Sequence, residues 1–169
     1  MVGDRNLNRA TAQIERAQAD KRLRPSIAGF FDEATNTVSY VVHDPKTGEA
    51  AIIDSVLDFD AASGRTSNGS ADRMIEYVTS NNLKVTWLIE THAHADHISA
   101  APYLQERLGG KLAIGCDIIR VQEVFGKLFN AGTDFERDGS QFDKLFEDGE
   151  TFRIGELEGI ALHVPGHTP

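Results

Sequence analysis

The stretch IETHAHADHIS, residues 89–99, places three of the chain's six histidines and an aspartate within six positions. It follows LKVTWLIE, residues 83–90, a nearly continuous apolar run of the kind that a fully buried strand shows. So many titratable side chains make a poor apolar core, because each buried polar group needs its own partner. Their position at the end of a buried strand therefore predicts a functional site.

The spacing of these polar residues favours a metal site. In an extended backbone, residues two apart point the same way, so His92, His94 and Asp96 would project to one side. His97 would join them where the chain turns into the next helix. Imidazole nitrogen and carboxylate oxygen are ligands that zinc, iron and manganese ions accept. We therefore interpret all four residues as candidate metal ligands.

A fifth candidate ligand lies at the end of the chain. LHVPGHTP, residues 162–169, places His167 after a strand and a Pro-Gly turn, where functional groups are commonly presented. His163 falls inside the predicted strand, and we interpret it as a histidine that packs or supports a ligand. One local cluster rarely closes a catalytic site, so we expect His167 to return to the first cluster.

The composition indicates one globular domain of 169 residues, with 40% hydrophobic and 25% charged residues. The net charge of −9 argues against a nucleic-acid partner, which would favour a basic face. No apolar run is long enough for a membrane span. The single cysteine, Cys116, is expected to be packed rather than catalytic and fits a cytoplasmic protein.

Residues 1–26 differ in composition from the rest and are expected to form an N-terminal extension. They carry six basic and three acidic side chains, and a helix stopped by Pro25 fits the pattern. A mitochondrial presequence, and hence the mitochondrial matrix, is the alternative to the cytoplasm, although the acidic residues disfavour it. We divide the chain into this extension and a domain at residues 27–169.

Hairpins flank a middle section in which strands and helices alternate. This order predicts an α/β fold, a layered sandwich rather than a purely parallel sheet. The predicted strands are 37–44, 49–55, 83–90, 111–115, 151–155 and 159–165, the predicted helices are 71–82, 98–108 and 117–130, and the Gly/Ser/Asn-rich stretch 61–70 is expected to be a loop.

THAHADH, residues 91–97, resembles the HxHxDH signature of the metallo-β-lactamase superfamily. PGHTP, residues 165–169, resembles that superfamily's next ligand loop, and Asp54 in AAIIDS stands like its aspartate at the end of an early strand. Together these matches extend over most of residues 27–169, and the motifs follow one another in the same order as in the family. The resemblance implies an αββα sandwich, of which this chain would be the N-terminal portion with the second half incomplete.

Finer details resemble the persulfide dioxygenases and the related bacterial β-lactamase-like hydrolases implicated in sulfide detoxification. Ala95 stands inside the signature and ISA, residues 98–100, follows it. Hydrolases of the glyoxalase II and lactamase kinds often carry a bulky residue and a Gly-Gly pair at these places. The resemblance implies one non-haem Fe(II) that oxidises glutathione persulfide to sulfite with O2.

In that reading His92 and His167 would bind iron together with a downstream aspartate. His94, Asp96 and His97 would orient ligands, water or substrate, with Asp96 and His97 as the catalytic candidates. The alternative is a dinuclear zinc hydrolase of a thioester or similar small molecule. There His92, His94 and His167 form one site, and Asp96 and His97 contribute to the other.

The family continues past PGHTP into strands that supply further ligands. We therefore expect the chain to be a C-terminally truncated portion of a longer protein, inactive or barely active alone. The expected partners are O2 and a small thiol or persulfide, which the resemblance implies is glutathione-based. We expect no nucleic-acid partner and no membrane. A third reading, a non-enzymatic metal-binding subunit completed by a partner, leaves a homodimer open.

Overall fold

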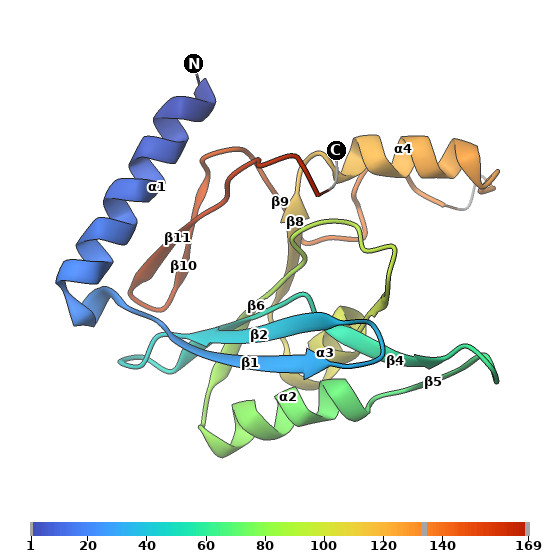
Figure 1. The fold of residues 1–169 in the computed structure, drawn as a ribbon, viewed down its shortest axis with the longest axis horizontal. Coiled ribbons are helices and arrows are strands. Elements are labelled where there is room, and N and C mark those ends of the chain that lie inside the picture. Colours follow the sequence, from blue (N-terminus) through green and yellow to red (C-terminus); the bar gives the residue numbers. More distant parts are fainter. Residues whose placement is uncertain (1, 133–134, 168–169) are drawn as a thin grey trace.

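A six-stranded mixed sheet forms the centre of the fold (Figure 1), with the strand order β1-β2-β3-β6-β8-β9. The computed structural model describes residues 2–132 and 135–167. The strands of this sheet are β1 (Ser26–Asp32), β2 (Thr37–His43), β3 (Glu49–Ile53), β6 (Lys84–Ile89), β8 (Lys111–Gly115) and β9 (Lys144–Phe146). The first three strands pair antiparallel, whereas β3, β6, β8 and β9 pair parallel.

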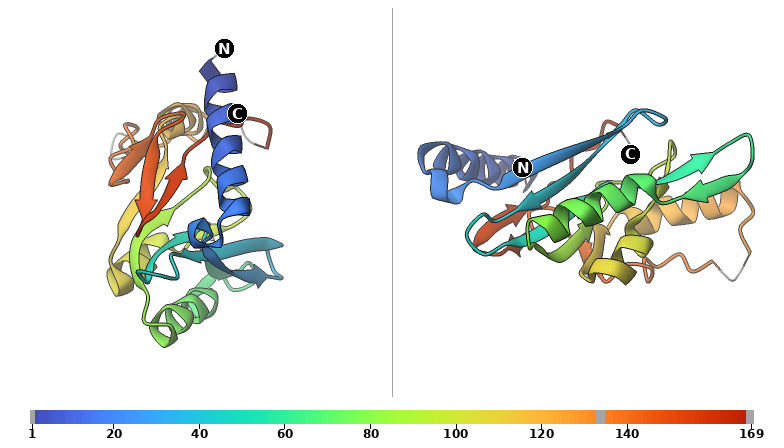
Figure 2. Two further views of the ribbon diagram at one scale, coloured as in Figure 1. Left: turned by 90° about the vertical axis from the view of Figure 1, so that its left-hand side faces the viewer. Right: turned by 90° about the horizontal axis from the view of Figure 1, so that it is seen from below.

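Two helices, α2 (Gly69–Ser80) and α3 (Ala101–Leu108), cover one face of the sheet (Figure 2). Met74 and Val78 of α2 are four residues apart, so they lie on one stripe of the helix, and both are buried. Leu104 of α3 is fully buried in the same apolar cluster. The main core therefore lies between the sheet and these two helices.

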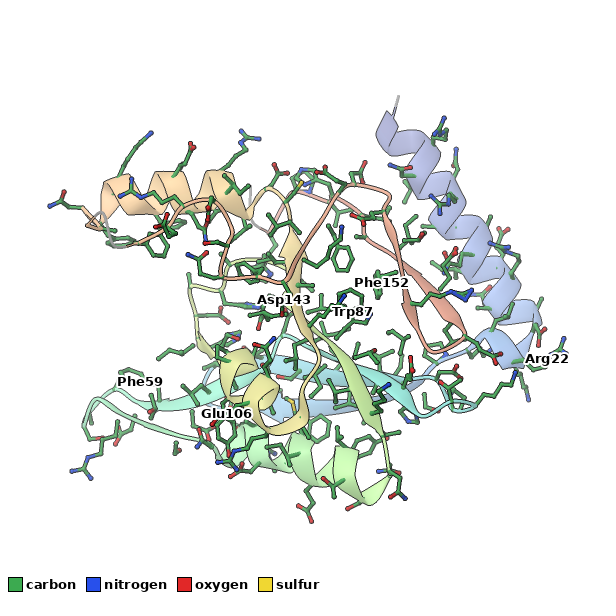
Figure 3. The ribbon with its side chains drawn as sticks, turned by 180° about the vertical axis from the view of Figure 1, so that it is seen from behind. Arg22, Phe59, Trp87, Glu106, Asp143 and Phe152 are labelled. Carbon is green, nitrogen blue, oxygen red and sulfur yellow. The ribbon has the colours of Figure 1, made fainter. Side chains whose placement is uncertain are left out.

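The opposite side of the sheet carries a hairpin of β10 (Thr151–Ile154) and β11 (Leu157–Ile160). Trp87 of β6 lies between the sheet and this hairpin (Figure 3). Its ring centroid is 5.5 Å from that of Phe146 and 6.1 Å from that of Phe152. These three aromatic rings form a second, smaller apolar cluster.

The N-terminal helix α1 (Val2–Ala19) and the short 3-10 helix η1 (Lys21–Leu23) precede the sheet. The amide of Asn6 donates a hydrogen bond of 2.9 Å to the carboxylate of Asp148, and Asn6 is buried. The helix that the sequence suggested before Pro25 is thus present, and it lies beside the β10–β11 hairpin (Figure 1).

The remaining elements lie around the carboxyl ends of the parallel strands. A small sheet in the order β5-β4-β7 consists of β5 (Arg65–Ser67), β4 (Val56–Asp60) and β7 (Ile98–Ser99). Helix α4 (Ile118–Leu128) lies on the side of the main sheet away from α2 (Figure 1). Within the described residues, no helix has both the length and the apolar character needed to cross a membrane.

The α/β class is confirmed, but three local predictions were wrong. The stretch 61–70 is not all loop, because β5 pairs with β4 and α2 begins at Gly69. The helix predicted from residue 98 begins at Ala101, because β7 first pairs with β4. The strand predicted to reach Pro165 ends with β11 at Ile160, because β10 offers no partner beyond that residue. Strands β1, β4, β7 and β9 were not predicted.

Replacing Leu104 by alanine should lower the free energy of unfolding by about 2–5 kcal/mol, because the side chain is fully buried and a cavity would remain. Leu128→Ala is the matched control, since Leu128 on α4 is 70% exposed and its loss should change stability by less than about 0.5 kcal/mol. Urea unfolding followed by circular dichroism measures both. Equal losses in the two variants would contradict the position of the core.

Candidate metal centre

The histidine-rich loop begins where β3 and β6 end at the same edge of the sheet. The backbone N–H of Asp54 donates to the carbonyl of Ile89 at 3.0 Å, and that of Glu90 donates to Ala113 at 2.9 Å. The parallel ladders thus extend one residue past each strand, and residues 91–97 then run without helix or strand. Because parallel strands present their carboxyl ends at one edge, Asp54 lies beside the start of this loop.

Four imidazole rings meet above this edge. The ring centroid of His94 is 4.1 Å from that of His92 and 4.1 Å from that of His97. The ring of His167, which comes from the end of the chain, lies 4.8 Å from His92. The structure therefore brings together all four histidines that the sequence singled out.

Asp96 completes the group at its exposed side. Its carboxylate has Oδ1 3.9 Å from His94 Nδ1 and Oδ2 3.4 Å from His97 Nδ1. His94, Asp96 and His97 each offer a ligand atom, and these atoms all lie within 4.8 Å of one another. The Asp96 side chain is 54% exposed, so the cluster is accessible from this direction.

His97 provides a test of whether these residues fit a metal ion. Its side chain is only 1% exposed, and its Nε2 has no hydrogen-bond partner in the part of the chain that the structure describes. A buried nitrogen without a partner costs free energy, which a metal–ligand bond would offset. Imidazole and carboxylate donors also suit zinc and iron. The residues therefore fit a divalent metal ion.

Two carboxylates contact the Nε2 side of the His94 ring. Its Nε2 lies 3.0 Å from Asp54 Oδ1 and 3.1 Å from Glu90 Oε2. Burial alone would lower the pKa of His94, but the hydrogen bonds and charges of the two carboxylates outweigh it and raise that pKa to about 9. For His92, burial and the neighbouring charge of His94 both lower the pKa. His92 is thus neutral, as a metal ligand must be.

Asp54 is fixed by its backbone and by Thr91. Its φ of 51° lies in the left-handed region, which a residue other than glycine seldom adopts and which is frequent at functional sites. The backbone N–H and the hydroxyl of Thr91 each donate to one carboxylate oxygen at 2.7 Å. Burial would raise the pKa of Asp54, but the hydrogen bonds from His94 and Thr91 hold it below its usual value.

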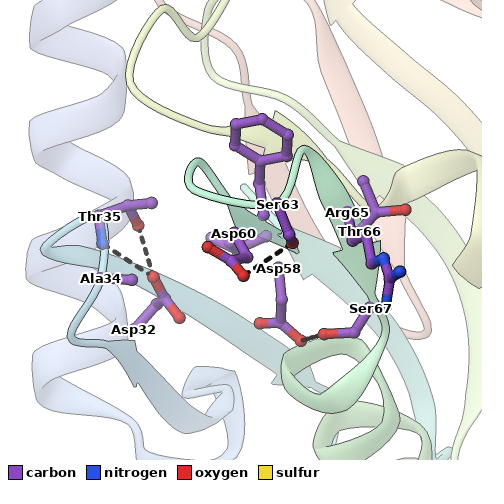
Figure 4. Close-up of a pocket in the computed structure, with 11 residues that line it drawn as sticks. Asp32, Ala34, Thr35, Asp58, Asp60, Ser63, Arg65, Thr66 and Ser67 are labelled. Carbon is purple, nitrogen blue, oxygen red and sulfur yellow. Dashed lines mark hydrogen bonds between the residues drawn. The ribbon is translucent and has the colours of Figure 1, made fainter.

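Threonine hydroxyls connect the exposed side of the cluster to the β1–β2 turn. Thr37 Oγ1 lies 3.3 Å from Asp96 Oδ2 and 3.4 Å from His97 Nδ1. Thr35 Oγ1 lies 2.9 Å from the Thr37 hydroxyl. Thr35 also lines a cavity of about 500 Å³ between this turn and the β4–β5 hairpin (Figure 4). The turn therefore supports the loop at Asp96 and His97.

A larger cavity, of about 700 Å³, opens beside His92 between the histidine-rich loop, α4 and residues 161–165. Much of its wall is apolar, formed by Ala93, Ala95, Ile114, Ile118, Val121 and Val124. Polar side chains, among them Arg120, also line the cavity. Its size and mixed lining are those of a pocket for a small molecule.

Cys116, which lines this cavity, is a thiol. Its Sγ–H donates to Glu147 Oε2 at 3.3 Å, and burial together with this carboxylate raises the pKa of the thiol.

The prediction that His163 lies inside a strand was wrong, because β11 ends before it. Its side chain is exposed and Nδ1 lies 3.1 Å from Asp117 Oδ2.

Sequence reasoning missed Glu90, Thr91 and Thr37 as neighbours of the cluster. For Glu90 a signal existed, since an acidic residue ends an apolar run four positions before His94. Thr37 carried no such signal, because it reaches the cluster only through the pairing of distant strands. The roles of the five predicted ligands stay predictions, whereas their proximity is observed.

Comparison with known proteins places the chain in a family. The model described as "Metallo-beta-lactamase superfamily" matches residues 32–169. A Burkholderia pseudomallei protein named "Probable metallo-hydrolase" is 58% identical over 144 residues, covering 85% of this chain and 49% of that protein. Human mitochondrial persulfide dioxygenase ETHE1 is 28% identical over 140 residues, covering 83% of this chain and 43% of that protein.

Among solved structures, ETHE1 from Myxococcus xanthus superimposes with a TM-score of 0.55 at 25% identity, covering 79% of this chain and 45% of that one. The chain spans about half the length of the curated relatives it matches. The predicted fold class and family resemblance are confirmed.

In the metal-free protein, the free energy of unfolding should fall as the pH rises from about 6.5 to about 9.5. The pKa of His94 is 6.5 in an unfolded chain and about 9 in the folded protein. Its stabilising contribution is therefore complete below 6.5 and is lost as the pH rises through 9, which amounts to at most about 3 kcal/mol. Urea unfolding with a chelator, at both pH values, measures the change.

His94→Gln should remove most of this dependence, because it removes the titrating ring. His163→Gln is the control, since its exposed pair with Asp117 lies outside the cluster and should leave the slope unchanged. A slope that persists in His94→Gln would show that another group causes it.

Proposed function

Because the chain belongs to the metallo-beta-lactamase superfamily, we propose that its histidine cluster holds iron and that the protein converts glutathione persulfide, O2 and water to sulfite and glutathione, with release of two protons. The observation that carries the proposal is the convergence of His92 and His167, of which His92 lines the apolar cavity, with the exposed Asp96 in the same cluster. Similarity to a protein named as a persulfide dioxygenase over 83% of this chain supports this choice of reaction.

In this proposal His92 and His167 hold the metal, and His92 meets it as a neutral ring because its pKa is lowered. Bound there, Fe(II) supplies the redox chemistry that lets O2 oxidise a sulfur atom. Asp96 is the exposed carboxylate of the cluster and takes the proton of the persulfide S–H group. His97 lies behind it, oriented through Nδ1 by Thr37.

The cavity beside His92 receives the thiol compound. Its apolar wall excludes water from the reacting sulfur, which strengthens the electrostatic contacts made there. Arg120 lines the cavity and offers a cation for a carboxylate of glutathione. The Asp117–His163 pair lines it too and presents a carboxylate for the ammonium group.

A second candidate is a dinuclear zinc hydrolase of a thioester or a similar small molecule. The buried and unpaired Nε2 of His97, next to Asp96, favours it among the described residues, because a second metal ion would bind both. His92, His94 and His167 would then form the first site. Zinc would lower the pKa of a bound water to near neutrality. The similarity to a protein named as a metallo-hydrolase agrees with this candidate.

The protein purified without added metal should contain iron and should consume O2 when glutathione persulfide is added. His92→Ala should lose both the iron and the oxygen uptake, because it removes one of the two histidine ligands. His163→Ala, which changes a histidine outside the cluster, should keep the iron. Metal analysis and an oxygen electrode make these measurements.

Zinc in place of iron, with hydrolysis of a glutathione thioester and no oxygen uptake, would reject the dioxygenase and favour the second candidate. Iron that remains bound in His92→Ala would contradict the assignment of the ligands.

A further inference from the structure

Glu90 is a buried carboxylate directly before the metal-binding loop. It is 6% exposed, and no lysine or arginine pairs with it within the described residues. Its Oε1 accepts a hydrogen bond of 2.5 Å from the Ser99 hydroxyl, and its Oε2 lies 3.1 Å from His94 Nε2. A buried carboxylate is costly unless such partners compensate it, so this position has a specific use.

We infer that Glu90 is a positioning residue for the metal centre, which acts with Asp54 to fix His94 so that Nδ1 faces the metal. The two carboxylates flank Nε2 at 3.1 and 3.0 Å, and both accept a hydrogen bond only if Nε2 carries the proton. A neutral imidazole has one N–H and one lone pair, so the lone pair then lies on Nδ1. Nδ1 is the nitrogen on the side of Asp96, 3.9 Å from its Oδ1.

Glu90 connects His94 to elements that Asp54 does not contact. Asp54 Oδ1 also accepts the backbone N–H of Thr91, so one oxygen serves two donors. Glu90 is fixed through Ser99, whose hydroxyl oxygen in turn accepts the backbone N–H of Ala101 at 3.0 Å. His94 is thereby tied to the end of β6, to β7 and to the first turn of α3. Such supporting contacts set both the orientation and the basicity of a ligand.

The geometry favours a proton over a metal ion between His94 and the two carboxylates. Ligand atoms of Asp54, Glu90 and His94 lie within 4.8 Å of one another, so a cation there is the competing arrangement. However, every carboxylate oxygen of this group already has a hydrogen-bond donor. The Asp54 carboxylate accepts hydrogen bonds from Thr91 and His94, and the Glu90 carboxylate accepts hydrogen bonds from Ser99 and His94.

This inference rests on the second candidate of the proposed function, in which His94 is a zinc ligand, whereas the iron proposal holds the metal through His92 and His167. The protonated nitrogen of His94 can also be identified in the metal-free protein. A failure of the proposed reaction is therefore distinguishable from a failure of this inference.

The test uses ¹⁵N NMR of the imidazoles and zinc binding measured by competition with a chelator. Without metal and above the His94 pKa of about 9, where the ring is neutral, His94 of the wild-type protein should carry its proton on Nε2, and it should bind added zinc through Nδ1. Glu90→Met keeps the length of the side chain but removes both acceptors. It should weaken zinc binding by about 10- to 100-fold and reduce the Nε2-protonated signal.

Glu90→Gln keeps an acceptor oxygen and should restore most of the affinity and of the signal, which a purely structural role would not require. Glu156→Met is the control, because Glu156 is exposed in a surface pair with Lys46 and should bind zinc like the wild type. If Glu90→Met does not fold, the zinc affinity of Ser99→Ala is measured instead. This variant removes the hydrogen bond from Ser99 to Glu90 and should also lower the zinc affinity, by less than about tenfold.

Wild-type affinity in a folded Glu90→Met variant, or in Ser99→Ala when the first variant does not fold, would overturn the inference. Zinc bound to Nε2 of His94 would also overturn it, because the ion would then lie among the carboxylates. If the wild type binds no zinc, the metal-free spectra decide, since a Nε2 proton that does not depend on Glu90 would reject the inference.

Discussion

The parallel pairing of β3 with β6 is the constraint on which the site depends. Their register sets Ile53 opposite Ile89, so that Asp54 and Glu90 follow as neighbours at the edge of the sheet. His94 bonds to both of these carboxylates. A slip of one residue would turn alternate side chains to the other face and would separate the two acids from their shared ring.

A bulge within this pair sets which side chains reach the core. Val85 pairs with Ala50 and Trp87 with Ala51, so Thr86 is an extra residue on β6. Its hydroxyl donates to the Ala50 carbonyl at 3.2 Å, which satisfies an acceptor at the irregular position. After the bulge, Leu88 is buried in the cluster under the helices while Trp87 contacts the aromatic rings of the hairpin side. The same strand therefore serves two apolar clusters before it ends at the site.

Opposite charges compensate one another in the cluster, which explains why so many titratable side chains can lie close together there. Three carboxylates, those of Asp54, Glu90 and Asp96, lie around His94, whose raised pKa makes it a cation in the metal-free protein. In the proposed metal centre, a divalent ion takes over the compensation of this negative charge. Either cation offsets the cost of holding acids in a partly buried place.

The amino-acid sequence by itself determined which histidines gather at the candidate site and several of the elements around it. The crowding of histidines after an apolar run could be interpreted locally, because ligand type and strand periodicity are properties of short segments. The sequence also pointed to His167 through its turn, and the α/β class through alternation of strands and helices. It did not predict β1, β4, β5, β7 or β9. Of these, β7 and β9 are only two and three residues long and gain their pairing from distant partners.

Only the tertiary structure decided which groups support the cluster. Thr37 reaches His97 because strands far apart in the chain pair in one register, and no local pattern encodes that proximity. The orientation of His94 was likewise invisible in the sequence. It follows from two carboxylates at the ends of neighbouring parallel strands, which become neighbours only when the sheet forms.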